Sequence, residues 1–152
     1  SSKDQLLAAV LDERDRRIVS RLPRPEEGAE AALDAWADMV AHNQRHPDGV
    51  ALYTAMSAAV IDSKHQAHPW FREHLIGAIS YLVEAFEHGK TTGEVREDAP
   101  SEQIARRLVA ISDGLQVQWL CSRADGGRAL NMHEVMAGVA VDMKERWLIR
   151  SE

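Results

Sequence analysis

The chain has 152 residues, of which 45% are hydrophobic and 28% charged, a composition typical of one water-soluble domain with its own core. Its formal net charge of −6 argues against the basic surface that direct binding to nucleic-acid phosphates requires. No apolar run reaches the roughly 18 residues of a membrane-spanning helix, so we expect no membrane partner.

Helical periodicity begins with the first residues. Ser2 is a candidate N-cap with Gln5 three residues later, and the apolar residues that follow continue the helical pattern. Pro23 and Pro25 break this first helix and start a second one. The inward face of the second helix is predicted to carry Ala29, Ala32, Leu33, Trp36, Val40 and Asn43.

Two further helices follow the turn formed by residues 46–49. The third helix is expected to extend to the vicinity of His65, and the fourth to begin at His68 and to stop at Gly89. The inward positions of the third helix are Tyr53, Met56 and Val60. Those of the fourth are Phe71, Leu75, Ala78, Leu82 and Phe86.

A polar connection over residues 91–98 leads into a long fifth helix, predicted over residues 100–122. One face of this helix is an apolar stripe of Ile104, Leu108, Ile111, Leu115 and Trp119. A second face carries mostly small residues, namely Ala110, Gly114, Val117 and Cys121. A helix that is apolar on two sides needs partners on two sides, so we expect its own domain on one and a second copy of the chain on the other. Cys121 is the only cysteine, which rules out an internal disulfide and fits a reducing cytoplasm.

Asn131 is the predicted N-cap of a sixth helix, because Glu134 follows three residues later. The amphipathic stripe of this helix consists of Met132, Val135, Met136, Val139, Ala140, Met143 and Trp147. No stretch of the sequence alternates between apolar and polar residues over the length of a strand. The sequence therefore predicts an all-α fold of six helices in one domain, residues 1–152.

Polar residues recur on the inward faces of three predicted helices, namely Asn43, Tyr53, Ser57, Ser112 and Gln116. A buried polar group must be paired, so these groups either bond to one another in a solid core or point into a ligand-binding cavity. Their recurrence in three helices favours the cavity. Its expected lining is Trp36, Asn43, Tyr53, Met56, Phe86, Ser112, Gln116 and Trp119. Acidic residues are sparse on these faces, which favours a neutral or weakly polar ligand over a strongly cationic one.

The sequence holds no recognisable catalytic or metal-binding motif. Its two groups of candidate metal ligands are Asp38, His42 and His46 on one helix, and His65, His68 and His74 further along. Neither group forms a closed four-ligand set. Ser112 lies mid-helix, which does not suit a nucleophile on a strained turn, and no phosphate-binding or dinucleotide-binding loop occurs. We therefore expect no metal, no cofactor and no enzymatic activity.

Several segments, in their order and spacing, resemble the regulatory part of the TetR family of transcription regulators. They are residues 2–11 (SKDQLLAAVL), 68–73 (HPWFRE) and 93–98 (GEVRED), followed by 105–110 (ARRLVA) and 113–116 (DGLQ). In that family a three-helix DNA-binding head precedes the first of these segments. The resemblance implies that residues 1–19 form the connecting helix and that the head is not part of this chain, so no DNA-contacting residue is assigned.

The same resemblance implies a homodimer in which the last two helices of two chains pack as a four-helix bundle. The expected interface residues are Ala110, Gly114, Val117, Cys121, Val135, Val139, Met143 and Trp147. It also implies a cytoplasmic repressor that a small-molecule effector releases from operator DNA. Two alternatives remain open at this point: a helical dimerisation module without a ligand, and, less favoured, a small-molecule enzyme on a helical scaffold.

Overall fold

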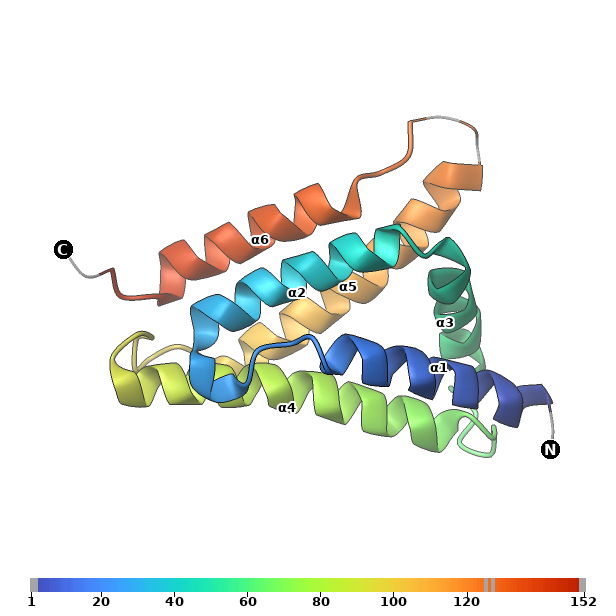
Figure 1. The fold of residues 1–152 in the computed structure, drawn as a ribbon, viewed down its shortest axis with the longest axis horizontal. Helices are drawn as coiled ribbons and strands as arrows, with labels where there is room; N and C mark the ends of the chain where they lie inside the picture. Colours follow the sequence, from blue (N-terminus) through green and yellow to red (C-terminus); the bar gives the residue numbers. More distant parts are fainter. Residues whose placement is uncertain (1–2, 125, 127, 151–152) are drawn as a thin grey trace.

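The computed structural model describes residues 3–124, 126 and 128–150, and over these residues the chain is built from α-helices (Figure 1). The elements are α1 (Lys3–Val19), the short 3-10 helix η1 (Pro25–Glu27), α2 (Ala29–Gln44), α3 (Pro47–Ala59), α4 (His68–Thr92), α5 (Ser101–Ala124) and α6 (Met132–Trp147). The only β-pairing among the described residues is an isolated bridge between Val95 and Leu148. No described helix is both long and apolar enough to cross a membrane. The predicted all-α fold of six helices is confirmed.

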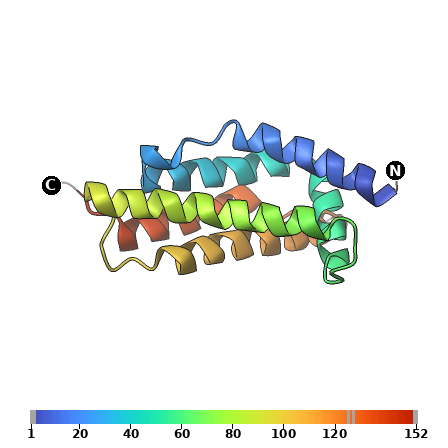
Figure 2. The same cartoon turned by 90° about the horizontal axis from the view of Figure 1, so that it is seen from below.

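The helices α2, α4, α5 and α6 run lengthwise, and α3 stands across one end of the molecule (Figure 1). Seen at right angles to this view, α1 lies along one edge and α5 along the opposite edge, with α4 between them (Figure 2). The described residues begin at one end of the long axis and finish at the other. The first and fifth helices therefore present separate surfaces of the molecule.

Buried apolar residues form two clusters. The larger joins α2, α4, α5 and α6 and includes the fully buried side chains of Leu33, Leu82, Phe86, Ile104, Leu108, Met132 and Met136. The smaller joins α1, α3 and α4 through Leu11, Tyr53, Met56, Ala67 and Phe71. The stripes predicted from helical periodicity supply most of both clusters, because a helix in this fold is stabilised mainly by burial of its apolar face.

The prediction that Gly89 stops the fourth helix is wrong. The helix continues to Thr92 and ends at Gly93, whose φ of 78° is the left-handed conformation that favours glycine. Gly89 is buried within the helix, and a Cβ atom built on it would lie 2.5 Å from Cγ2 of Val95. The glycine is thus required for close packing inside the helix and not for its termination.

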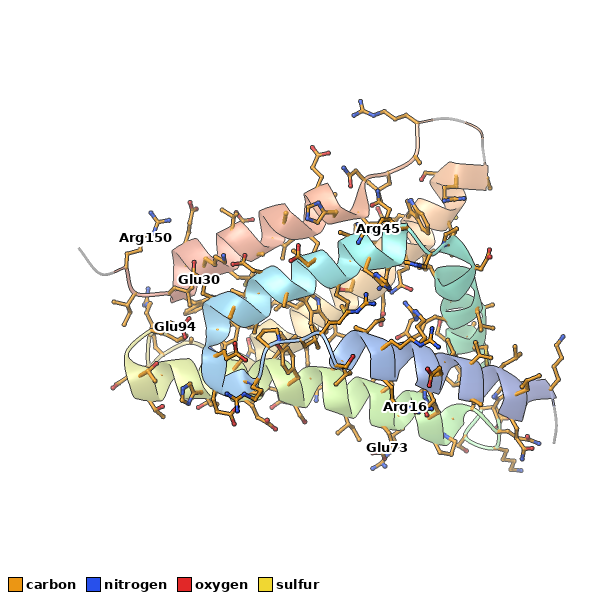
Figure 3. The ribbon with its side chains drawn as sticks, in the orientation of Figure 1. Arg16, Glu30, Arg45, Glu73, Glu94 and Arg150 are labelled. Carbon is orange, nitrogen blue, oxygen red and sulfur yellow. The ribbon has the colours of Figure 1, made fainter. Side chains whose placement is uncertain are left out.

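The second helix begins later than the proline pattern predicted. Pro25 opens η1, and Gly28 separates this turn from the first residue of α2, Ala29. The side chain that caps α2 comes from a distant part of the chain. Glu94 accepts hydrogen bonds from the backbone N–H groups of Ala29 (2.9 Å) and Glu30 (2.8 Å), beside the start of α2 (Figure 3).

The remaining helix ends agree in part with the sequence. The third helix ends at Ala59, so His65 lies outside it in the following turn. The predicted cap of the sixth helix is confirmed, because Oδ1 of Asn131 accepts the backbone N–H of Glu134 at 3.3 Å. The predicted cap at Ser2 lies outside the described residues.

The connection between α4 and α5 joins three helices. Besides holding α2 through Glu94, it receives the end of α6, because the N–H of Arg96 donates to the carbonyl of Trp147 (2.9 Å). In return the N–H of Ile149 donates to the carbonyl of Glu94 (2.8 Å). This junction fixes the end of the helical bundle that lies away from α3 (Figure 1).

Candidate ligand-binding cavity

A cavity of about 560 Å³ lies among α1, α2, α3, α4 and α5. Most of its wall is apolar, and the apolar lining includes Ile18, Leu22, Pro23, Met39, Ala78, Tyr81 and Val109. The polar lining is contributed mainly by Arg14, Asp15, Asn43, Tyr53, His74, Asp113 and Gln116. A largely apolar cavity of this size with a few polar groups is typical of sites that bind small organic molecules.

The structure brings five of the eight predicted lining residues together in the wall of this cavity, namely Trp36, Asn43, Tyr53, Ser112 and Gln116. Met56, Phe86 and Trp119 do not line it. Each is buried in the core one or more turns along its helix from a residue that does. Helical periodicity gives the face on which a residue lies but not its depth along the axis, and this explains the three errors.

The predicted lining included no residue of the first helix and only Phe86 of the fourth, whereas several residues of both helices line the cavity. The missed residues include Arg14, Asp15, Ile18 and Leu22 from the first segment, and Trp70, His74, Ala78 and Tyr81 from the fourth helix. A signal was present in both places. The spacing from Leu11 to Asp15 and Ile18 is helical, as is the spacing from Phe71 to His74 and Ala78. Asp15 and His74 interrupt the apolar pattern of these two series, so the pattern does not indicate one continuous inward face.

The polar residues gather around Tyr53. Its hydroxyl donates to Oδ1 of Asp113 (3.2 Å). The centroid of the Tyr53 ring lies 5.3 Å from the ring centroid of His74 and 5.8 Å from the guanidinium carbon of Arg14. Burial raises the pKa of the Tyr53 phenol above its ordinary value, and the Asp113 carboxylate raises it further. Burial also raises the pKa of Asp113, although the hydrogen bond from Tyr53 and the proximity of His74 oppose this shift.

Two polar contacts at the cavity hold α1 against the other helices. Arg14 donates through Nη2 to Oδ1 of Asn43 on α2 (2.7 Å), and the carboxylate of Asp15 contacts Nδ1 of His74 on α4. The guanidinium of Arg14 is largely buried, and burial lowers its pKa from the ordinary value. A molecule bound in the cavity would therefore lie against the groups that fix the position of α1.

Some polar groups of the wall are paired within the protein and others are not. Nε1 of Trp36 donates to Oγ of Ser112 (2.9 Å), and that hydroxyl donates to the carbonyl of Leu108 (2.9 Å). Oε1 of Gln116 and the hydroxyl of Tyr81 are buried without a hydrogen-bond partner among the described residues. Burial and nearby Glu27 raise the pKa of Tyr81 to about 12.

This arrangement of helices matches a solved structure. The crystal structure of a TetR transcription regulator from Haloarcula marismortui superposes with a TM-score of 0.76, over 98% of this chain and 80% of that chain, at 22% sequence identity. The chain has the TetR regulator fold. The resemblance stated from the sequence is thereby confirmed at the level of fold. No protein-family model and no curated protein sequence matches the chain.

Within the TetR-type fold, most of the residues predicted at a dimer interface lie on the surface. Ala110, Val117 and Cys121 on α5 are exposed, as is Val135 on α6, whereas Gly114, Val139 and Met143 are half-buried. A Cβ atom built on Gly114 meets no other atom within 4 Å. We call these seven residues the α5–α6 strip. Its exposed members, Ala110, Val117, Cys121 and Val135, are not covered by the described part of the chain.

Trp147 does not belong to the α5–α6 strip. Its side chain is only 7% exposed and packs in the main core, with the guanidinium carbon of Arg96 lying 5.6 Å from its ring centroid. Helical periodicity puts Trp147, in the last turn of α6, on the same stripe as Val139 and Met143. At that turn the chain docks on the connection between α4 and α5, so the tryptophan faces its own domain.

The histidines flagged in the sequence have separate structural roles. The rings of His42 and His46 lie 4.2 Å apart, and Nδ1 of His46 contacts the carbonyl of His42 at 2.8 Å. Nδ1 of His68 contacts the carbonyl of Val60 at 2.7 Å, and His74 contacts Asp15. Within the described part of the chain, no group of three or more His, Cys, Asp or Glu side chains is arranged to hold a metal ion.

Proposed function

We propose that this chain is the effector-binding and dimerisation domain of a TetR-like repressor, in which a small molecule in the cavity releases the intact protein from DNA. The observation that carries the proposal is the position of the cavity against α1, in a fold shared with a TetR transcription regulator. In such a repressor α1 connects to the DNA-binding head, and operator DNA is bound through that head. We place the protein in the cytoplasm, where such a regulator reaches DNA.

The contacts at the cavity suggest how a ligand would act on α1. Arg14 and Asp15 are neighbours on α1 and hold it to Asn43 and His74 respectively. A ligand shifts the position of a helix only if it binds one position more tightly than another. Because the ligand would touch both contacts, it would favour the α1 position in which these groups and the ligand are best paired. In a dimer, that position would set the spacing of the two heads on successive half-sites.

The homodimer is also part of the proposal. The α5–α6 strip offers small and β-branched residues on two helices, which suits the close approach of helices in a four-helix bundle. Val117 is 49% exposed and Val135 is 38% exposed, so both would gain burial from a partner. The side of the molecule that carries α5 lies opposite α1, so dimerisation leaves α1 free to move (Figure 2).

Ligand binding is tested by a thermal-shift screen of small apolar compounds against the wild-type chain and Ala78→Trp, which fills the cavity. Compounds should raise the melting temperature of the wild type and not that of the variant, because binding stabilises only the folded state. Circular dichroism of the variant establishes that it is folded. Equal shifts of the melting temperature in both proteins would count against the proposal. So would a screen in which no compound stabilises the wild type, together with a cavity shown to contain only solvent.

The enzyme alternative gains one observation from the structure. Titratable groups converge in the cavity, since Asp15 contacts His74 and Tyr53 donates to Asp113. A base with an orienting carboxylate is one part of an acid–base site. The only hydroxyl of a Ser or Thr in the described wall, that of Ser112, is already engaged with Trp36 and Leu108, which favours the regulator. Recovery of a bound compound as a chemically altered product would reverse that preference.

A further inference from the structure

Most of the charged side chains that line the cavity lie toward one end of it along α4, which we call its polar end. His74 lies at the polar end with Tyr53, and Tyr81 lies near Glu27 and the prolines that follow α1. Seven residues separate His74 from Tyr81, which is about 10 Å along a helix. Between them Ala78 on α4, with Met39 and Val109 opposite, provides an apolar wall. The cavity thus suits an elongated molecule whose two ends differ in polarity.

At the polar end, two hydrogen-bond acceptors on α5 have room for further donors. One N–H of Arg14 donates to Asn43, and the indole N–H of Trp36 donates to Ser112. Among the described residues, the carboxylate of Asp113 accepts a hydrogen bond only from the hydroxyl of Tyr53, although a carboxylate has about four acceptor positions. Gln116, three residues further along α5 and 8% exposed, has no donor for Oε1 among the described residues. Two neighbouring acceptors on one helix face therefore lack donors.

The charges at this end leave a carboxylate without a cation. The charged or titratable side chains that line the cavity are Asp12, Arg14 and Asp15 from α1, Arg24 from the segment after it, Glu73 and His74 from α4, and Asp113 from α5. Asp12 pairs with Arg16 and Glu73 with Arg72, and Asp15 contacts His74. Asp113 forms no ion pair among the described residues. A buried charge is costly unless it is paired, so a cationic group from outside the chain would be stabilised there.

Resting on the proposed function, we propose that the effector is an amphipathic amine, with a ring-containing apolar body and a protonated nitrogen that binds between Asp113 and Gln116. A protonated amine brings two or three N–H donors and one positive charge, which suits a carboxylate that has one donor and a neighbouring amide oxygen that has none. The body would lie against Trp36, Met39 and Tyr81. The sequence favoured a neutral ligand because it placed neither Asp15 nor Asp113 on an inward face.

The experiment uses three probes that share one body, namely phenylbutylamine, phenylbutanol and phenylbutyrate. Their dissociation constants are measured by titration calorimetry, with quenching of tryptophan fluorescence as a second readout because Trp36 and Trp70 line the cavity. For the wild type we expect the amine to bind about tenfold or more tighter than the alcohol, as a charged hydrogen bond implies, and the carboxylate to bind most weakly.

Asp113→Asn should abolish the preference for the amine while leaving the affinity for the alcohol nearly unchanged. Asp142→Asn is the matched control, because it removes the same charge from an exposed position on α6 and should preserve the preference. Since Asp113 also lines an outer groove between α4 and α5, Ala78→Trp is included to block the cavity alone, and it should weaken all three probes.

Two failures are distinguishable. If the amine and the alcohol bind equally to the wild type, and Ala78→Trp weakens both, the cavity is a binding site but the inferred ligand class is wrong. If no probe binds, or if Ala78→Trp leaves binding unchanged, the proposed function and the inferred ligand class are both contradicted. A preference for the amine that survives Asp113→Asn would also overturn the inference, because another group would then supply the charge.

Discussion

The carboxylate of Glu94 occupies the space that a side chain at Gly28 would need. A Cβ atom built on Gly28 would lie 2.6 Å from Oε2 of Glu94, the same oxygen that accepts the N–H of Ala29. The φ of Gly28 is 102°, in the region that side chains disfavour. Gly28, between the first two helices, thus leaves the space that Glu94, after the fourth helix, needs in order to cap the start of α2.

Gly28→Ala is therefore expected to lower the free energy of unfolding by about 2–4 kcal/mol, because backbone strain and displacement of Glu94 act together. Gly93→Ala is the matched control. Gly93 also has a positive φ, of 78°, but a Cβ atom there meets nothing within 4 Å. Its substitution should cost only the backbone strain, about 1 kcal/mol. Urea denaturation of both variants measures the difference, and equal losses would show that the Glu94 contact contributes nothing.

Two glycines of α4 should respond in opposite directions to alanine. Gly89→Ala places a Cβ atom 2.5 Å from Cγ2 of Val95 and should destabilise the fold by about 1–3 kcal/mol. Gly77→Ala meets nothing within 4 Å and should stabilise it by about 0.5–1 kcal/mol, since alanine favours the helix. The two melting curves are compared in one buffer. A shift of the same sign in both would refute the packing role assigned to Gly89.

Gly114→Leu should separate dimerisation from folding. In the single chain the new side chain enters open space and replaces a poor helix former, so the fold should be retained. At a close helix contact the same side chain would cost about 1–3 kcal/mol, which weakens a dimer by about tenfold to a hundredfold. Sedimentation equilibrium measures the change, with Ala9→Leu on the exposed surface of α1 as the control. A dimer that is unaffected by Gly114→Leu would place the interface elsewhere.

Asp113→Asn is expected to stabilise the chain at neutral pH. Because burial raises the folded-state pKa of Asp113, the folded protein holds this proton more tightly than the unfolded chain. The resulting stability is fully present below the ordinary Asp pKa of 3.8 and is lost as the pH rises through the folded-state pKa. The variant should therefore melt above the wild type near pH 7, and the gap should close as the pH falls toward that ordinary value. A gap independent of pH would contradict the assigned shift.

Met56→Ala should cost about 2–5 kcal/mol, as expected for a methionine buried in a core and not for one that lines a cavity. Met56 is 6% exposed and packs in the cluster that joins α1, α3 and α4. Met39, which is half-buried and lines the cavity, provides the comparison, and Met39→Ala should cost clearly less. Denaturant titrations of both variants decide the matter. Equal losses would mean that the cavity is packed like the core in solution.

The contrast between these methionines shows what the sequence could and could not predict. Periodicity identified Trp36, Tyr53 and Ser112 as inward residues, and the structure places all three at the cavity. It could not distinguish Met56 from Tyr53, because residues one turn apart share a face and differ only in depth. Nor could it find the cap of α2, because Glu94 is 65 residues from Ala29 in the chain.

The charged wall residues were missed for another reason. From the sequence, Asp15 and His74 are expected to be solvated positions on amphipathic helices. In the structure both are partly buried, and the contact between them, from α1 to α4, offsets the free-energy cost of that burial. Compensation of this kind depends on tertiary structure, so hydrophobic patterning does not reveal it. The inward faces predicted from the sequence also leave out Asp113, although it lies three residues from Gln116 on the same helix.

The junction around Glu94 also bears on how such a protein could diversify. Glu94, Gly28 and Trp147 hold the ends of η1, α2 and α6 at the connection that follows α4, and Gly89 packs against the same connection. None of these residues lines the cavity. Substitutions in the wall can therefore change which molecule is bound without loosening the junction. Natural variation and laboratory evolution could therefore change the ligand specificity while the scaffold stays intact. A destabilising mutation in the wall would leave the contacts of the junction, and the stability that they contribute, unchanged.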